Sequence, residues 1–129
     1  KSEDLREKII VILKQCLPFK DTLAFHMADL TNALSKCLLD PKAELKSNSS
    51  LIEKTSELIN DLSTELRGVI GKYAVALSKS LAENLKNNKY LVRKNTLVTI
   101  GRLLITEGAG GNFEHVQTSL KVSLADAKT

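Results

Sequence analysis

The chain has 129 residues, of which 43% are hydrophobic and only 4% aromatic, and its formal net charge is +4. This length suits one domain or one segment of a longer repeat array. No apolar run reaches the roughly 18 residues of a membrane-spanning helix, and no signal peptide is present. We therefore expect no membrane partner. Aliphatic cores with few aromatic residues favour closely interlocking helices.

The first half of the chain predicts three helices. The first covers residues 2–17, with an apolar stripe of Leu5, Ile9, Ile12 and Cys16, and Pro18 ends it. The second begins after Asp21 and runs to residue 38, with its stripe formed by Leu23, Met27, Leu30, Leu34 and Leu38. Asp40 and Pro41 start a third helix, because Asp can cap free amides and Pro is tolerated at the first helical position. This third helix should run to residue 62 and bury Leu45, Ile52, Ile59 and Leu62.

The second half predicts three more helices. Ser63 starts the fourth, which runs to residue 85 with a stripe of Leu66, Ile70, Tyr73, Leu77, Leu81 and Leu85. The fifth covers residues 90–106 and should bury Leu97, Ile100 and Leu104. A glycine-rich loop at 108–111 precedes a sixth helix over 112–125. No segment shows the alternation of polar and apolar residues that is typical of strands.

Two stretches of the sequence, 38–46 and 85–93, share one outline at a distance of 47 residues. Each passes from a leucine-rich helix through a tight turn into an aliphatic-plus-basic pair, Leu45–Lys46 or Val92–Arg93. A shorter echo at 124–128 lies at the end of the sequence. Such periods are typical of stacked HEAT repeats, whereas tetratricopeptide repeats have a period of about 34 residues.

We therefore predict an all-α fold, an α-solenoid of antiparallel helix pairs (HEAT repeats) with about six helices. The repeat segment should occupy residues 1–129. Helices one to three fall within 2–62, helices four and five within 63–106, and 112–125 is the first helix of a truncated repeat. The absence of an initial Met and the end just after a repeat turn indicate a monomeric slice of a longer array.

Catalytic motifs are missing from the sequence. There is no Gly-x-Ser-x-Gly elbow, Walker loop, HExxH or Cys-x-x-Cys motif. The glycine-rich loop follows a helix and lacks a suitably placed lysine, so a linker explains it better than a phosphate site. We expect no enzyme activity, no cofactor and no metal site.

Positive charge is the one functional signal. The stretch 86–102 holds five basic residues and no acidic residue, and turns of a HEAT stack align along one edge. The predicted partner-binding ridge consists of Lys42, Lys46, Lys89, Arg93, Lys94 and Arg102. It could attract acidic protein surfaces, acidic tubulin tails or nucleic-acid phosphates. Alternatively these are ordinary solvated charges, with Arg93 acting to cap or cross-link repeats.

The sequence also resembles one family more particularly, the HEAT-repeat axonemal dynein assembly factors. The resemblance covers nearly the whole chain and is carried by Glu3–Arg6, His26–Leu30, Ser35–Pro41, Asn88–Arg93, Ile100–Gly101 and the glycine-rich loop before Phe113. It implies a cytoplasmic, non-catalytic scaffold that helps to preassemble dynein arms, with axonemal dynein chains and chaperones as partners.

Two other classes of scaffold remain open. A tubulin-binding HEAT array would need exposed residues at successive turns, for which Pro41, Asn88 and Tyr90 are candidates. A nucleic-acid-associated HEAT scaffold would lose affinity steeply with salt. Two observations argue against nucleic-acid binding: the net charge is small, and aromatic residues do not alternate with the basic residues.

Overall fold

The computed structural model describes residues 2–39, 50–106 and 121. Its helices, in chain order, are α1 (Ser2–Gln15), α2 (Lys20–Phe25), α3 (Met27–Leu38), α5 (Ser50–Glu65), α6 (Arg67–Ile70), the 3₁₀ helix η1 (Gly71–Tyr73), α7 (Ala74–Ala82), the 3₁₀ helix η2 (Glu83–Lys86) and α8 (Tyr90–Leu104). No strand occurs within these described ranges. The all-α solenoid prediction is confirmed. The predicted helix over 112–125 lies outside the described residues except at residue 121.

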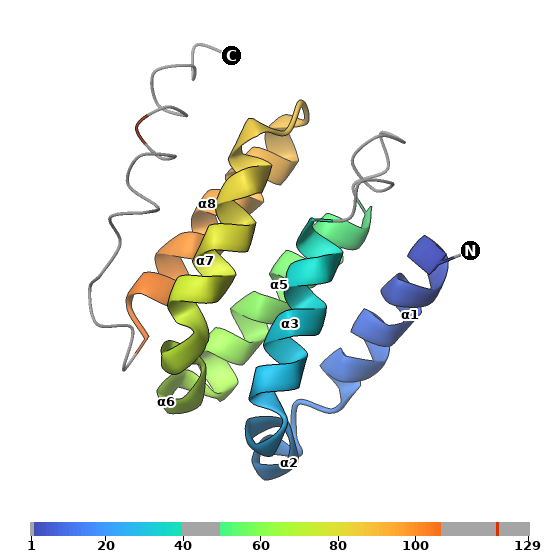
Figure 1. Cartoon of the computed structure of the whole chain (residues 1–129), viewed down its shortest axis with the longest axis vertical. Coiled ribbons are helices and arrows are strands. Elements are labelled where there is room, and N and C mark those ends of the chain that lie inside the picture. Colours follow the sequence, from blue (N-terminus) through green and yellow to red (C-terminus); the bar gives the residue numbers. More distant parts are fainter. Residues whose placement is uncertain (1, 40–49, 107–120, 122–129) are drawn as a thin grey trace.

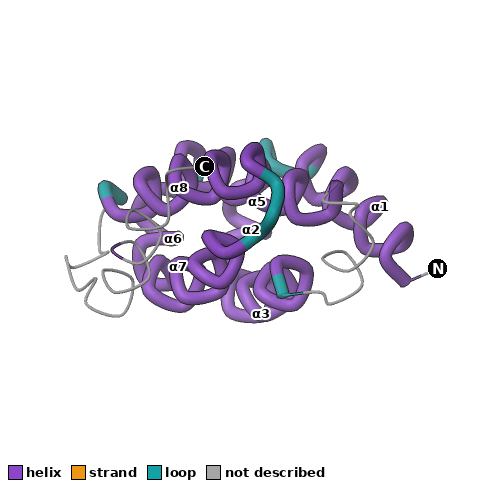
Figure 2. Tube along the Cα trace, turned by 90° about the horizontal axis from the view of Figure 1, so that it is seen from above, coloured by secondary structure: helices purple, strands orange, loops and turns teal. Residues whose placement is uncertain are grey.

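The helices form two layers. One layer holds α1, α5 and α8, with α5 packed between the other two (Figures 1 and 2). The second layer holds α3 and α7, which pack against each other and against the first layer. Consecutive long helices thus alternate between layers, as α3 packs on α5 and α7 on α8. This alternation is the packing that an α-solenoid uses to share one continuous core.

The layer of α3 and α7 shows the repeat directly. Equivalent buried residues recur 47 positions apart in four pairs, namely Met27 and Ala74, Leu30 and Leu77, Leu34 and Leu81, and Leu38 and Leu85. All eight belong to the buried core. Seven of the eight lie in α3 and α7, and Leu85 lies in η2, which directly follows α7. The sequence period of 47 residues is therefore also the structural period.

A buried hydrogen bond connects the two repeats at the ends of these helices. The side-chain amide of Asn84 donates to the backbone carbonyl of Leu38 at 3.0 Å. The last carbonyls of a helix have no partner within the helix, and a buried carbonyl without a partner is costly. Asn84 therefore satisfies the end of α3 and fixes the position of η2 beside it.

The break after α5 differs from the predicted restart at Ser63. The helix continues through Ser63 to Glu65, and the backbone leaves helical geometry at Leu66, with φ −121° and ψ 39°. The hydroxyl of Ser63 donates to the carbonyl of Ile59 at 2.8 Å, four residues earlier in the same helix. A serine that bonds back in this way is satisfied in mid-helix and does not act as a cap.

Two predicted apolar stripes face differently from the expectation. On α1, Ile10 is buried whereas Leu5, Ile9 and Ile12 are exposed. On α8, Leu97 is 43% exposed, and the buried residues are Val92, Thr96, Thr99, Ile100 and Leu103. Both helices carry apolar residues on two faces, and the stripe that was predicted for α1 lies on its exposed face.

Candidate protein-binding site

The residues of the predicted basic ridge differ in their surroundings in the structure. Lys42 and Lys46 lie outside the described residues, so their alignment with the other four stays a prediction. Lys89 immediately precedes α8 and is exposed. Arg93, in the first turn of α8, is half-buried, whereas Lys94 and Arg102 are exposed further along the same helix.

Arg93 is used within the fold. Its Nη1 donates to the backbone carbonyls of Asn87 at 2.8 Å and of Asn88 at 3.0 Å. Its guanidinium carbon also lies 5.9 Å from the ring centre of Tyr90, within reach of a cation–π contact. Arg93 thus fixes the turn before α8.

The same turn determines where α8 starts. The side-chain oxygen of Asn87 accepts a hydrogen bond from the backbone N–H of Lys89 at 2.8 Å. This local bond holds the chain extended just before the helix, since Lys89 has φ −84° and ψ 125°. Asn87 and Arg93 together set the direction in which α8 leaves the turn.

Lys94 and Arg102 carry the charge that is available on α8 itself. Neither forms an ion pair with any residue in the described ranges. They lie eight residues apart, which is about 12 Å along a helix axis. These two cations therefore follow α8 and lie beyond the turn that precedes it.

Apolar residues surround these two cations, which the sequence analysis did not predict. Leu91 is 57% exposed, Val98 46% and Ile105 69%. A spacing of seven residues returns to the same helix face, so Leu91 and Val98 share the outside of α8, and Ile105 continues their line directly after the helix ends. The sequence does show Leu, Val and Ile at intervals of seven residues, which indicates an apolar helix face. The prediction instead placed the apolar face of the helix on the stripe through Leu97 and Leu104.

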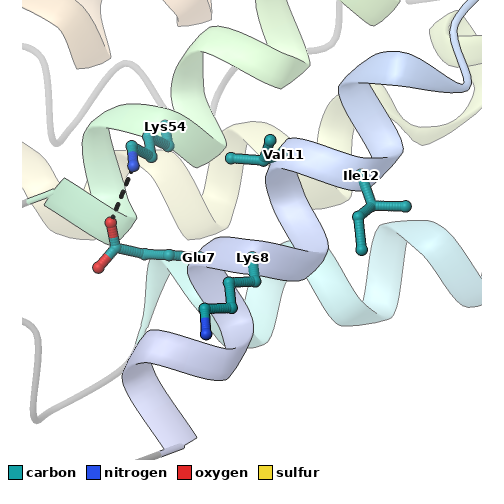
Figure 3. A pocket seen from close by; sticks show the side chains of 5 residues that line it. All are labelled: Glu7, Lys8, Val11, Ile12 and Lys54. Carbon is teal, nitrogen blue, oxygen red and sulfur yellow. Dashed lines mark ion pairs between the residues drawn. The ribbon is translucent and has the colours of Figure 1, made fainter.

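A separate shallow groove of about 550 Å³ lies beside α1. The described residues that line it are Glu7, Lys8, Val11, Ile12 and Lys54 (Figure 3). Glu7 and Lys54 face each other across helices α1 and α5, and their charged atoms are 3.2 Å apart. The groove contains none of the predicted basic residues, and Glu7 already neutralises one of its two lysines.

No group of three or more His, Cys, Asp or Glu side chains that could hold a metal ion occurs among the residues that the structure describes. Within that same part of the chain, no helix is both long and apolar enough to cross a membrane.

Comparison with known proteins identifies the family. A family model described as "Dynein axonemal assembly factor 5-like, TPR repeats" matches residues 1–129. The chain belongs to this family. Comparisons with curated proteins and with solved structures gave no match.

The repeat length of this dynein axonemal assembly factor 5-like chain differs from the tetratricopeptide repeat in the family description. The family is described by tetratricopeptide repeats, whose period is about 34 residues. Here α3 and α7 repeat at 47 residues, which is the upper end of the range for HEAT repeats. The family resemblance predicted from the sequence is confirmed, and the register of the buried leucines agrees with the longer repeat.

Proposed function

We propose that this chain is a non-catalytic protein-binding scaffold that acts in the cytoplasmic preassembly of axonemal dynein arms. Axonemal dynein chains and chaperones are the proposed partners. The observation that carries the proposal is the match of a dynein axonemal assembly factor 5-like family model along all 129 residues. The helical repeat fold supports it, because solenoids offer extended surfaces for binding other proteins.

The outer face of α8 is the proposed contact surface. It presents Lys94 and Arg102 beside an exposed apolar line, a combination that suits protein recognition better than ordinary solvation. Arg93 is left out of this proposed surface because its Nη1 is bound to the carbonyls of the turn.

Affinity purification from the cytosol of ciliated cells, read by mass spectrometry, tests the proposal. The wild-type chain is compared with a Lys94→Glu/Arg102→Glu variant and with Lys79→Glu, a control that changes one exposed lysine on α7. Axonemal dynein chains and chaperones should be enriched by the wild type and by the control, and lost with the double variant. Enrichment of tubulin or of nucleic-acid-binding proteins in their place would contradict dynein preassembly as the function.

A further inference from the structure

We propose that the outer face of α8 binds an acidic amphipathic helix of a partner protein. The partner's apolar side chains would cover Leu91, Val98 and Ile105, and its carboxylates would pair with Lys94 and Arg102. This inference rests on the proposed scaffold function and adds the chemistry of the partner segment.

The first argument is that the fold does not require this exposed apolar line. Helix α5 occupies the same layer as α8, and all its apolar residues, Leu51, Ile52, Leu58, Ile59 and Leu62, are buried. The exposed residues of α5 are polar, namely Lys54, Glu57, Thr64 and Glu65. A helix of this layer can therefore present an entirely polar outer surface, and α8 does not.

The second argument is the spacing of the exposed residues. Leu91, Lys94, Val98, Gly101 and Ile105 follow intervals of three, four, three and four residues, and all five are exposed. This is the spacing of a seam along which a second helix packs at a shallow angle. From Leu91 to Ile105 the seam is about 21 Å long, enough for four turns of a partner helix.

Gly101 makes room in the middle of the seam. A Cβ built on this residue would meet no atom within 4 Å, so its surface side is open. Without a side chain at this position, the backbone of a partner helix can approach closely between Val98 and Ile105. Small residues have this effect where helices cross.

Charge selects the kind of helix. Lys94 belongs to the seam and Arg102 follows Val98 by four residues, so one cation lies toward each end of the apolar line. The sequence contains no acidic residue between positions 84 and 106. A helix with carboxylates flanking its apolar face would thus find complementary charges, whereas a basic helix would be repelled.

Fluorescence anisotropy with the whole chain and two synthetic helical peptides provides the test. Both labelled peptides have about 18 residues and leucines at intervals of three and four, a length of about 27 Å as a helix. One carries glutamates beside the leucines and the other carries lysines at the same positions. We expect the acidic peptide to bind at least about tenfold more tightly, and its affinity to fall with added salt.

Three variants assign this binding to α8. Lys94→Glu/Arg102→Glu should reverse the preference, so that the lysine peptide binds more tightly than the glutamate peptide. Leu91→Ser/Val98→Ser/Ile105→Ser should abolish binding of both peptides while the helical circular dichroism is retained. Lys79→Glu on α7 should leave both affinities unchanged. Equal binding of the two peptides, or the same loss with Lys79→Glu, would overturn the proposal.

Other occupants of the face give distinct results. Self-association in sedimentation equilibrium that the serine variant removes would assign the face to a second copy and overturn the proposal. A large fall in melting temperature of the serine variant would mean that the chain itself covers the face, again overturning it. Binding of the wild type to vesicles of one-quarter anionic lipid, in place of the peptides, would do the same.

The outcome is separable from that of the proposed function. Charge reversal with the peptides but no capture of dynein chains from cytosol would leave the acidic-helix surface standing and remove dynein preassembly. Capture of dynein chains equally by the wild type and by Lys94→Glu/Arg102→Glu, without peptide binding, would keep the function and overturn the surface.

Discussion

The two sides of α5 are built from different chemistry. Toward α1, ion pairs connect the helices at an exposed edge. Lys54 of α5 pairs with Glu7, and Lys14 of α1 hydrogen-bonds Glu57 and lies 3.7 Å from Asp61. Further along, Lys20 in α2 is 3.2 Å from Glu65. Each pair involves at least one half-exposed side chain, so each contributes little by itself.

Toward α8, small buried residues with hydroxyl groups take the place of the ion pairs seen toward α1. The two helices bury five of them, Thr55, Ser56, Ser63, Thr96 and Thr99. Three are satisfied by a carbonyl four residues earlier in their own helix, at 2.7 Å for Thr55, 2.8 Å for Ser63 and 2.9 Å for Thr99. Helices α5 and α8 pack against each other, and short side chains allow helix backbones to approach closely, which favours van der Waals packing as the source of this contact.

The difference indicates which contact tolerates change. A contact held by exposed ion pairs can lose any one of them at small cost, since water and salt compete for the charges. A contact between closely packed small residues has no free volume, so an added side chain must move a helix. We expect substitutions near α8 to be costly and those near α1 to be mild.

The largest effect is expected from Ser56→Leu. Ser56 is 1% exposed, so the three carbon atoms that replace its hydroxyl oxygen must displace neighbouring helices, at a cost of about 1–3 kcal/mol in the free energy of unfolding. Urea denaturation measures this. Glu57→Leu, at the next and exposed position, is the matched control and should change stability far less. Equal effects of the two substitutions would show that close packing beside Ser56 is not limiting.

Thr96→Val should have the opposite sign. Thr96 is fully buried and its hydroxyl has no hydrogen-bond partner among the described residues. Valine has nearly the same shape without the unsatisfied group, so stability should rise by about 1 kcal/mol. Thr99→Val is the control, because the Thr99 hydroxyl is bonded to the carbonyl of Asn95. A loss of stability in Thr96→Val would imply a partner for that hydroxyl.

The sequence predicted the α3–α7 layer well and the α1–α5–α8 layer less well. The stripe from Leu23 to Leu38 is buried as predicted, as is most of the stripe from Leu66 to Leu85. Helices α1 and α8 each carry a second apolar face, and periodicity alone does not tell which of two apolar faces points inward. The buried Thr96 and Thr99 of α8 were missed because a count of hydrophobic residues leaves threonine out. Only Thr99 is buried with its hydroxyl bonded back to its own helix.

Of the candidate site, the sequence predicted the positive charge but not the exposed apolar line or the role of Arg93. A basic run without acids was visible in the sequence, and Lys94 and Arg102 are exposed. That Arg93 binds turn carbonyls depends on the conformation at Asn87 and Asn88, which charge patterning does not determine. The predicted division of the chain into repeats at 2–62, 63–106 and 112–125 stays a prediction.

Glu7→Gln should have a small, pH-dependent effect on the α1 side. The side chain is 15% exposed, and its carboxylate accepts a hydrogen bond from Ser50 at 2.6 Å. This hydrogen bond, together with the nearby Lys54, lowers the pKa of Glu7 below its usual 4.5. A carboxyl whose pKa is lower in the folded state stabilises the fold above the unfolded pKa and loses this contribution as pH falls through the folded value.

The wild type should therefore be more stable than Glu7→Gln at pH 7, by less than about 1 kcal/mol. The difference should disappear only below the usual carboxyl value of 4.5, as the pH falls through the lowered pKa of Glu7 and the wild-type carboxyl takes up its proton. Thermal unfolding at several pH values measures it. Glu83→Gln, at an exposed position of η2 away from α1, is the control. A difference that persists unchanged into the acidic range would show that charge at Glu7 is not the cause.

The smallest effect is expected from Lys14→Met, although Lys14 contacts two acids. The Glu57 carboxylate, with Asp61 behind it, raises the pKa of Lys14, so any stabilisation is complete below the usual lysine pKa of 10.5 and is lost only above it. Both Lys14 and Glu57 are well exposed, at 46% and 62%, and water screens their attraction. Methionine keeps most of the aliphatic stem that lies along α1. We expect no measurable change in the urea midpoint at 0.15 M salt, and a clear fall would show that this pair, unlike its neighbours, is held rigidly enough to stabilise the α1–α5 contact.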